Sequence, residues 1–354
     1  MANLRYRSSI TILSAIILSI SFLSVTVTSG TSFGSSEEER SAKLIEQAKQ
    51  ESKIVIYTTQ SVRDSSRMVE KFTEKYPFLK AELYRAPSNT LMNKLNGEAK
   101  AKRYISDVIE IPGFNAYYLK KDHLTTSYIS PESRAFSEGF KDADGYWTAT
   151  YVLHYIIAYN TKLLARKDIP DNYEGFLNPK WRGKIGLFDA KETEWFANML
   201  KIMGEEKGLD FFRKLSNQEL AYRGGSSLMT DLIVAGEFPL GTVFPQAVED
   251  RKKKGAKVDW VGVAPVIAKL GTIGLAAHAS HPNAAKLDID FCLSKEGQAV
   301  LVECERFPAR SDMDVEKFKA LKALKIYPSD FALADKFNTY SKQFAEVVKW
   351  KKSR

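Results

Sequence analysis

Hydroxyl and amide side chains follow the apolar run at residues 54–57 and lead directly into a helical pattern. They are Thr58, Thr59, Gln60 and Ser61. The first backbone N–H groups of a helix have no partner inside the helix. With the positive end of the helix dipole, such groups suit an anionic or acceptor-rich ligand. The turn is therefore a candidate ligand-binding segment, and ordinary helix capping is the alternative.

Other predicted strands also end in polar or glycine-containing turns that open helices. Ligands of parallel sheets bind beyond the carboxyl ends of the strands. Arginine adds a planar, positively charged group that matches carboxylate or phosphate, and aromatic side chains at strand ends can wall a pocket. The candidate ligand-binding residues beyond the first turn are Arg85, Tyr151, Asp189, Glu192, Thr193, Arg223, Ser226, Ser227 and Phe244.

Signatures of common enzyme classes are absent from the sequence. It contains no phosphate-binding G-x-x-x-x-G-K-[ST], no G-x-G-x-x-G after a strand, no H-E-x-x-H and no G-x-S-x-G. His278 and His281 are three residues apart, but a metal site needs further ligands, and Pro282 is predicted to begin a helix there. We expect no metal, no cofactor and no catalytic residue. An exported enzyme of the same architecture is the alternative.

The pattern of elements that must position these residues is α/β. From residue 36 to 113, strands alternate with single helices, which predicts a parallel sheet covered on both faces. A β-rich stretch at 146–160, a second α/β set at 184–254 and an extended stretch at 258–279 follow. The two extended stretches predict a chain that crosses twice between two lobes. We expect lobe 1 at residues 36–150 and 263–312, lobe 2 at 151–262, and a C-terminal helical segment at 313–354 that packs on the lobes.

The N-terminus has the order of residues found in a secretory signal. Arg5 and Arg7 precede an apolar stretch at residues 10–27, and small residues follow. Ser and Thr interrupt the stretch, which suits a cleaved signal better than a membrane span. We expect a signal peptide at residues 1–30 and a periplasmic protein. An uncleaved membrane anchor is the alternative.

Charge and cysteine content narrow the classes further. The 354 residues carry a formal net charge of +9, but basic and acidic residues are mixed along the chain. The basic run at 251–254 is predicted to be a solvated helix end, and we expect no nucleic-acid partner. Cys292 and Cys304 are the two cysteines. An exported chain can pair them, or both can be buried as small apolar side chains.

Several stretches give the chain a family resemblance, above all "NPKWRGKIGL" at 178–187 and "LSKEGQ" at 293–298. With these motifs it resembles the solute-binding proteins of ABC importers, in the branch related to ferric-iron binding proteins. The resemblance implies a type II periplasmic binding protein fold, in which two α/β lobes joined by two crossover strands enclose a small-molecule solute. It also implies a membrane permease and an ATPase as partners, and we expect a monomer.

One stretch departs from the pattern of that branch. Its iron binders carry a tandem tyrosine after the strand that here reads "PLGTVFPQAVED", where this chain has Phe244 and Pro245. Gln246 follows them and joins the candidate ligand-binding residues. Tyr117 and Tyr118 are adjacent but lie where the family places no ligands, so we interpret them as packing residues. A small organic anion, or an iron complex that brings its own ligands, suits the remaining turns better than bare ferric iron. His154, near a predicted crossover, is a packed or hinge residue or reaches the cleft. A membrane-tethered sensor is a further alternative.

Overall fold

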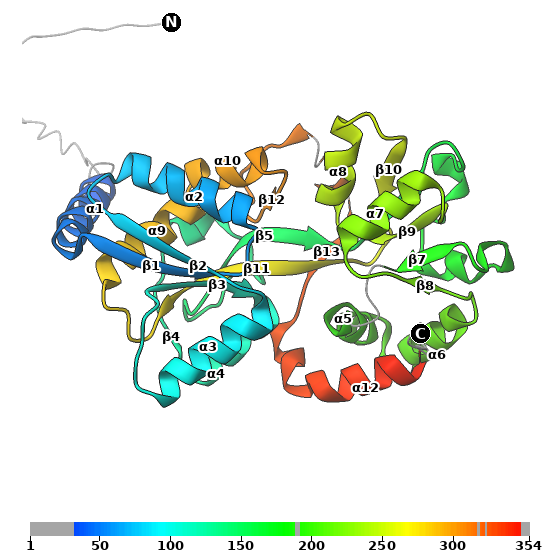
Figure 1. Ribbon diagram of the computed structural model, residues 1–354, viewed down its shortest axis with the longest axis horizontal. Helices are drawn as coiled ribbons and strands as arrows, with labels where there is room; N and C mark the ends of the chain where they lie inside the picture. The colour runs from blue at the N-terminus through cyan, green and yellow to red at the C-terminus, as the bar shows by residue number, and fades with distance from the viewer. Residues whose placement is uncertain (1–31, 188–191, 317–318, 323, 348–354) are drawn as a thin grey trace, which may run out of the picture. The chain divides into compact units, whose positions relative to one another are not determined.

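Two β-sheets with covering helices make up most of the chain in the computed structural model (Figure 1). The structure describes residues 32–187, 192–316, 319–322 and 324–347. Residues 1–42 and 43–354 form separate units, and the sheets belong to the second. The predicted signal peptide lies outside the described residues. In the first unit the described residues are the start of helix α1, Ser32–Glu51.

The first sheet, sheet A, contains three parallel strands at one end, each followed by a helix. Its strand order is β12-β5-β11-β3-β1-β2, and β4 (Thr125–Thr126) and β13 also pair with β11. Register pairs Thr58 with Arg85 and with Glu110, which brings the strand ends to one edge. The parallel strands are β1 (Lys53–Thr58), β2 (Lys80–Arg85) and β3 (Val108–Pro112), and the helices that follow them are α2 (Val62–Lys75), α3 (Ser88–Lys100) and α4 (Gly113–Lys121).

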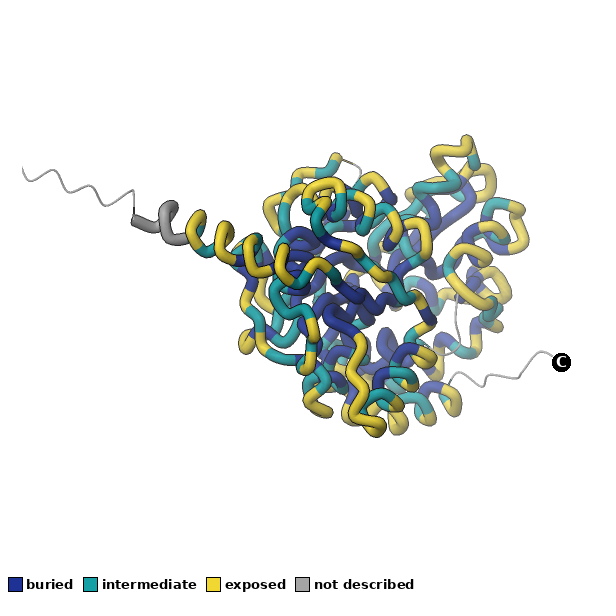
Figure 2. The backbone as a smooth tube through the Cα atoms, turned by 60° about the vertical axis from the view of Figure 1, so that its left-hand side comes forward, coloured by how far each residue is buried: buried dark blue, intermediate teal, exposed yellow. Residues whose placement is uncertain are grey.

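Burial of strand β1 on both faces explains why its sequence is a continuous apolar run. Ile54 and Ile56 belong to the core on the α2 side of the sheet, whereas Val55 and Tyr57 belong to a second core with residues of α3 and α4. Each fully buried isoleucine contributes about 1.5–3 kcal/mol relative to exposure. In Figure 2 the buried segments lie in the interior, and turns of the outer helices are exposed.

The second sheet, sheet B, repeats this arrangement with strand order β10-β6-β9-β7-β8. Three of its strands are parallel and precede helices, and Figure 1 shows α5 on one side of the sheet and α7 and α8 on the other. The helix α6 (Glu205–Ser216) was not predicted from the sequence. The other elements are β7 (Ile185–Leu187), α5 (Thr193–Met203), β8 (Ala221–Tyr222), α7 (Ser226–Ala235), β9 (Leu240–Val243) and α8 (Pro245–Lys253).

The chain passes between the sheets at two places, as the two extended stretches predicted. Strand β5 (Thr148–His154) of sheet A and β6 (Ile156–Asn160) of sheet B are separated only by Tyr155. The return runs from β10 (Val258–Val261) of sheet B to β11 (Val266–Ala276) of sheet A. The predicted fold class, two α/β lobes joined by two crossover strands, is confirmed.

The chain after β11 adds two strands to sheet A and one helix to the second lobe. Helix α12 packs on α5 and α6, where the Phe344 ring stacks on Phe196 at a centroid distance of 4.8 Å. A 3-10 turn at Phe331–Lys336 precedes α12. The further elements are α9 (Pro282–Leu293), α10 (Lys295–Glu303), β12 (Phe307–Pro308), α11 (Lys319–Lys322), β13 (Ile326–Pro328) and α12 (Phe337–Val347).

Pro87 is the N-cap residue of α3 and makes no side-chain capping hydrogen bond. Cys292 and Cys304 are both buried free thiols, so the disulfide alternative is wrong in this structure. Across the described ranges, every helix is too short or too polar to cross a membrane.

Candidate functional site

Helix N-termini gather at the carboxyl edge of each sheet. Helices α2, α3 and α4 begin beyond the parallel strands of sheet A, and α5, α7 and α8 begin beyond those of sheet B. Only α2 has its own side-chain cap, in which Ser61 accepts from the Asp64 N–H. The N-cap residues of the other five form no side-chain hydrogen bond to the backbone N–H groups of their own helices. Both edges therefore offer backbone donors and positive dipole ends to a ligand.

The turn after β1 is held by a network around Glu110. Gln60 Nε2 donates to Glu110 Oε1 at 3.0 Å, and the Gln60 N–H donates to Thr58 Oγ1 at 3.1 Å. The Thr59 N–H donates to the Glu110 carbonyl at 3.1 Å, and Arg85 Nε donates to the Gln60 carbonyl at 2.9 Å. All of the predicted residues of this turn, and Arg85 from the next strand, are thus brought together.

Glu110 itself is fully enclosed. Burial raises its pKa to about 7, against hydrogen bonds from Thr58 and Gln60 that lower it. Asp288 of α9 is buried nearby, and burial together with the charge of Glu110 raises its pKa well above the ordinary value. Two protonatable carboxyl groups therefore lie beneath the first-lobe turn, and the protonation of Glu110 changes near neutral pH.

In the second lobe, Tyr155 connects the predicted residues. Its hydroxyl donates to Glu192 Oε2 at 2.5 Å, and its ring packs edge-on against Phe244 at 5.2 Å between centroids. The Phe244 N–H donates to Ser226 Oγ at 2.8 Å. Glu192, Ser226 and Phe244, which begin or precede three different helices, therefore form one cluster around the crossover residue.

Lys269 of strand β11 joins this cluster from the other crossover. Its Nζ lies 3.4 Å from Glu192 Oε2 and 3.5 Å from Glu194 Oε2. The two carboxylates raise the lysine pKa although burial opposes the charge, and burial raises the pKa of Glu194. One oxygen of Glu194 is buried with no hydrogen-bond partner in the described part of the chain. The N-terminus of α5 is thus joined to one crossover by the Tyr155 hydrogen bond and to the other by the ion pairs with Lys269.

The remaining predicted residues lie in varied surroundings. Arg223 is half-exposed, and its Nη2 pairs with Glu237 at 2.7 Å. Thr193 is buried at the start of α5, Ser227 is exposed at the start of α7, and Gln246 has a buried amide oxygen without a partner among the described residues. Asp189 lies outside the described residues.

Tyr151 of β5 belongs to the first-lobe side. Its ring packs on Gly271, where a Cβ would lie 2.2 Å from the ring, so that only glycine permits this approach. The Arg306 guanidinium lies 5.7 Å from the ring centroid and forms an ion pair with the buried Asp64. Burial raises the pKa of Tyr151. The phenol is therefore held neutral beside a paired arginine.

An ion pair and a charge interaction also connect helix α8 of the second lobe to the first lobe. Lys253 of α8 forms an ion pair with Glu305, which follows α10. The charge of Asp250, also on α8, acts on Arg63 at the start of α2. Helix α8 of the second lobe therefore lies close to the first-lobe helices α2 and α10.

Sequence reasoning missed Glu110, Tyr155, Glu194, Lys269 and Arg306. Two of them carried a signal, because Glu110 interrupts the apolar strand "VIEIP" and Lys269 interrupts "VIAKLGTIGLA". A lone charged residue in a strand buried on both faces must have a partner. Tyr155 and Arg306 carried no comparable signal.

The structure also shows the surroundings of the histidines and of the adjacent tyrosines. His281 Nδ1 lies 2.8 Å from the buried Asp107, and within the described residues no three His, Cys, Asp or Glu side chains form a metal-binding group. Tyr117 and Tyr118 bind residues 335 and 334 through their hydroxyls. His154 is buried in β5 and lines a pocket.

Comparison with known sequences decides the family. Residues 105–335, more than half of the chain, match the family described as bacterial extracellular solute-binding protein. The chain belongs to this family. An uncharacterized protein of Haemophilus influenzae is 24% identical over 181 residues, which cover 49% of this chain and 52% of that protein. The match thus spans about half of that curated relative.

The chain also matches solved structures of the same fold over nearly the whole length of those structures. Iron-bound HitA from Pseudomonas aeruginosa has a TM-score of 0.74 at 17% identity, covering 83% of this chain and 99% of its own. AfuA from Actinobacillus pleuropneumoniae, solved with fructose-6-phosphate, has a TM-score of 0.70 at 22% identity, covering 84% and 99%. A ferric ion-binding protein A from Pasteurella haemolytica has 0.74 at 16%, covering 86% and 100%. This fold is that of the two-lobed type II periplasmic binding proteins.

Proposed function

We propose that this member of the extracellular solute-binding family serves an ABC importer. It captures a small anionic organic solute, or an iron complex, between its lobes and delivers it to a membrane permease that an ATPase drives. The observation that carries the proposal is the set of helix N-termini without side-chain caps at the carboxyl edges of both sheets. Such termini favour negatively charged oxygen atoms.

The N-terminus of α8 supports an organic anion or a complex over bare ferric iron. Phe244 and Pro245 occupy the place where iron binders of the resembled branch carry paired tyrosines, and neither offers an anionic oxygen. Ferric iron is a hard cation that prefers anionic oxygen ligands. The relatives' own ligands, iron in one and fructose-6-phosphate in another, show that one fold serves both chemistries.

Mass spectrometry tests the proposal directly. Small molecules released from the purified, denatured protein should include one anionic molecule, or an iron complex with an anionic chelator, in roughly stoichiometric amount. Calorimetry with that molecule should then give saturable one-site binding, and the molecule should be recovered chemically unchanged. Recovery of a converted product would support the enzyme alternative, and a neutral or cationic bound molecule would remove the anion proposal.

We also propose that the signal segment is removed between residues 24 and 36 and that the mature protein works as a periplasmic monomer. The charged start, apolar stretch and small residues of the N-terminus support cleavage. N-terminal sequencing of the exported protein should begin inside that window. A start at residue 1 or 2 would favour the membrane-tethered alternative instead.

A further inference from the structure

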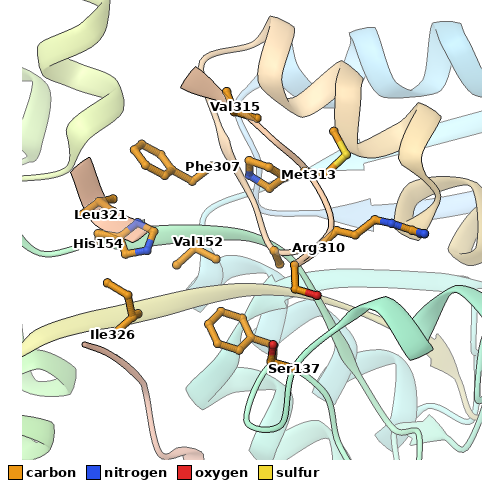
Figure 3. A pocket seen from close by; sticks show the side chains of 13 residues that line it. Ser137, Val152, His154, Phe307, Arg310, Met313, Val315, Leu321 and Ile326 are labelled. Carbon is orange, nitrogen blue, oxygen red and sulfur yellow. The ribbon is translucent and has the colours of Figure 1, made fainter. Parts of the chain in front are cut away.

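A cavity of about 320 Å³ lies beside crossover strand β5, apart from the residues assigned to the solute. None of the predicted ligand-binding residues lines it. Its walls come from β5, β12, α11, β13, the segment that follows β12 and a segment at residues 137–140. They include Val152, His154, Phe307, Met313, Leu321 and Ile326 (Figure 3). The volume lies in the range of small-molecule sites.

The two faces of β5 explain this separation. Successive side chains of a strand point to opposite faces. Tyr151 packs on Gly271 and Arg306, whereas Val152 and His154 line the cavity. One strand therefore contributes to the candidate solute site with one face and to a second, apolar site with the other.

Arg310 and Ser311 of the cavity wall have polar partners, whereas one nitrogen of His154 has none among the described residues. Arg310 pairs with Glu132 and Asp312, and the Ser311 hydroxyl donates to the Ala135 carbonyl at 2.6 Å. His154 is 7% exposed, and its Nδ1 is buried without a hydrogen-bond partner among the described residues. A buried polar atom left without a partner has a free-energy cost, so a partner supplied by a ligand is favoured.

The cavity offers no free charge to a ligand. Burial lowers the pKa of His154 to about 3, so the ring is neutral at physiological pH. Neutral imidazole has one donor and one acceptor nitrogen, which suits a hydroxyl or an N–H group. The Phe307 ring, 4.9 Å from the imidazole between centroids, adds an aromatic wall. An ionised ligand would lose its hydration without gaining an opposite charge.

The volume of the cavity limits the size of a ligand. An apolar cavity of about 150 Å³ binds benzene, and this one is roughly twice as large. We propose that the pocket binds an uncharged, mainly apolar molecule of about two fused rings that carries one hydrogen-bonding group. This group forms a hydrogen bond with the His154 imidazole.

Indole, indene and indole-3-acetate are suitable probes, because they share two fused rings and differ in the N–H group and in charge. Ligand-observed NMR titration of the purified protein should show saturable binding of indole, weaker binding of indene and none of indole-3-acetate. With methyl-labelled protein, indole should shift the signals of Met313, Val152, Leu321 and Ile326 before those of other methyl groups. This mapping uses the unaltered chain and does not depend on a variant that folds.

Two variants separate the polar and the apolar contributions. His154→Phe should weaken indole binding about three- to tenfold, the effect of one neutral hydrogen bond, and leave indene binding within twofold. Met313→Trp, which fills the cavity from its partly exposed rim, should abolish binding of both. Leu163→Trp, at an exposed site, is the control and should change neither. Indole shifts that map elsewhere, or the absence of saturable indole binding, would overturn the proposal.

Discussion

The hydroxyl of Tyr155 lies 2.5 Å from Glu192 Oε2 and joins the crossover between the sheets to the N-cap of α5. Tyr155 is the single residue between β5 and β6, and its ring also packs on Phe244 at the N-terminus of α8. The Tyr155 side chain therefore connects this crossover to two of the helix N-termini that we propose bind the solute.

Tyr155→Phe tests this connection, because it removes the hydroxyl and keeps the ring. Hydrogen bonds to charged groups contribute about 1.5–3 kcal/mol, so we expect urea unfolding to show a loss of about 2 kcal/mol. Tyr159→Phe is a matched control on β6, since no hydrogen bond of its hydroxyl occurs among the described residues. Equal effects of the two substitutions would show that the Tyr155 hydroxyl makes no special contribution.

Glu110→Gln should change how stability depends on pH. The folded pKa of Glu110 is raised by burial from 4.5 to about 7, so between these values the native state binds more protons than the unfolded state. Stability therefore falls as pH rises through this window, by about 3 kcal/mol, and stays low above it. The variant lacks this carboxyl, and its amide oxygen can still accept from Gln60.

Urea unfolding at pH 5 and pH 8 checks this prediction. The free energies of wild type and Glu110→Gln should differ more at pH 8, in favour of the variant. Asp288 and Glu194 also have raised pKa values and act in the same direction, so the difference between the two proteins reports Glu110 together with its effect on Asp288. Glu46→Gln, on an exposed part of α1, is the control. Parallel wild-type and variant profiles would contradict the assignment.

Ferric salts should give no purple-red tyrosinate colour with this protein. The Tyr57 hydroxyl donates to Glu98 at 2.7 Å, and burial, followed by this hydrogen bond, raises its pKa to about 12. Burial also raises the pKa of Tyr151. Deprotonating these phenols to bind iron is therefore unfavourable. Visible absorption after ferric addition checks this, and a band that disappears in Tyr57→Phe, Tyr84→Phe or Tyr151→Phe would contradict it.

Arg223→Ala should weaken binding of the anionic molecule recovered from the protein by about tenfold, the effect of losing one charge-assisted hydrogen bond. Its present partner is Glu237, in an ion pair that is about 40% exposed on both sides. Breaking so exposed a pair changes stability little, so the melting temperature should stay unchanged. Arg182→Ala breaks a comparable exposed pair with Glu219 and is the matched control for calorimetry. If both variants bind within twofold of wild type, Arg223 is a surface residue only.

The sequence by itself determined the alternation of strands and helices and the two crossings between sheets. These follow from local patterns, such as the apolar run of β1 followed by the polar turn at Thr58, and from the long extended stretches without helix signals. The motif "NPKWRGKIGL" identified the family for the same reason, because it is a continuous stretch. Helix α6 was not predicted, although it too is a continuous stretch of the sequence.

Only the tertiary structure decided which polar groups meet. Glu192 and Lys269 are 77 residues apart in the chain, and Gln60 and Glu110 are 50 apart. Glu110 and Lys269 are recognisable in the sequence as charges within buried strands, but their partners depend on which strands pair and how the crossovers pack. Arg223 shows the same limit, since its pairing with Glu237 depends on the approach of β8 to the end of α7. Pairing partners are set by long-range packing, which a local pattern of residues does not contain.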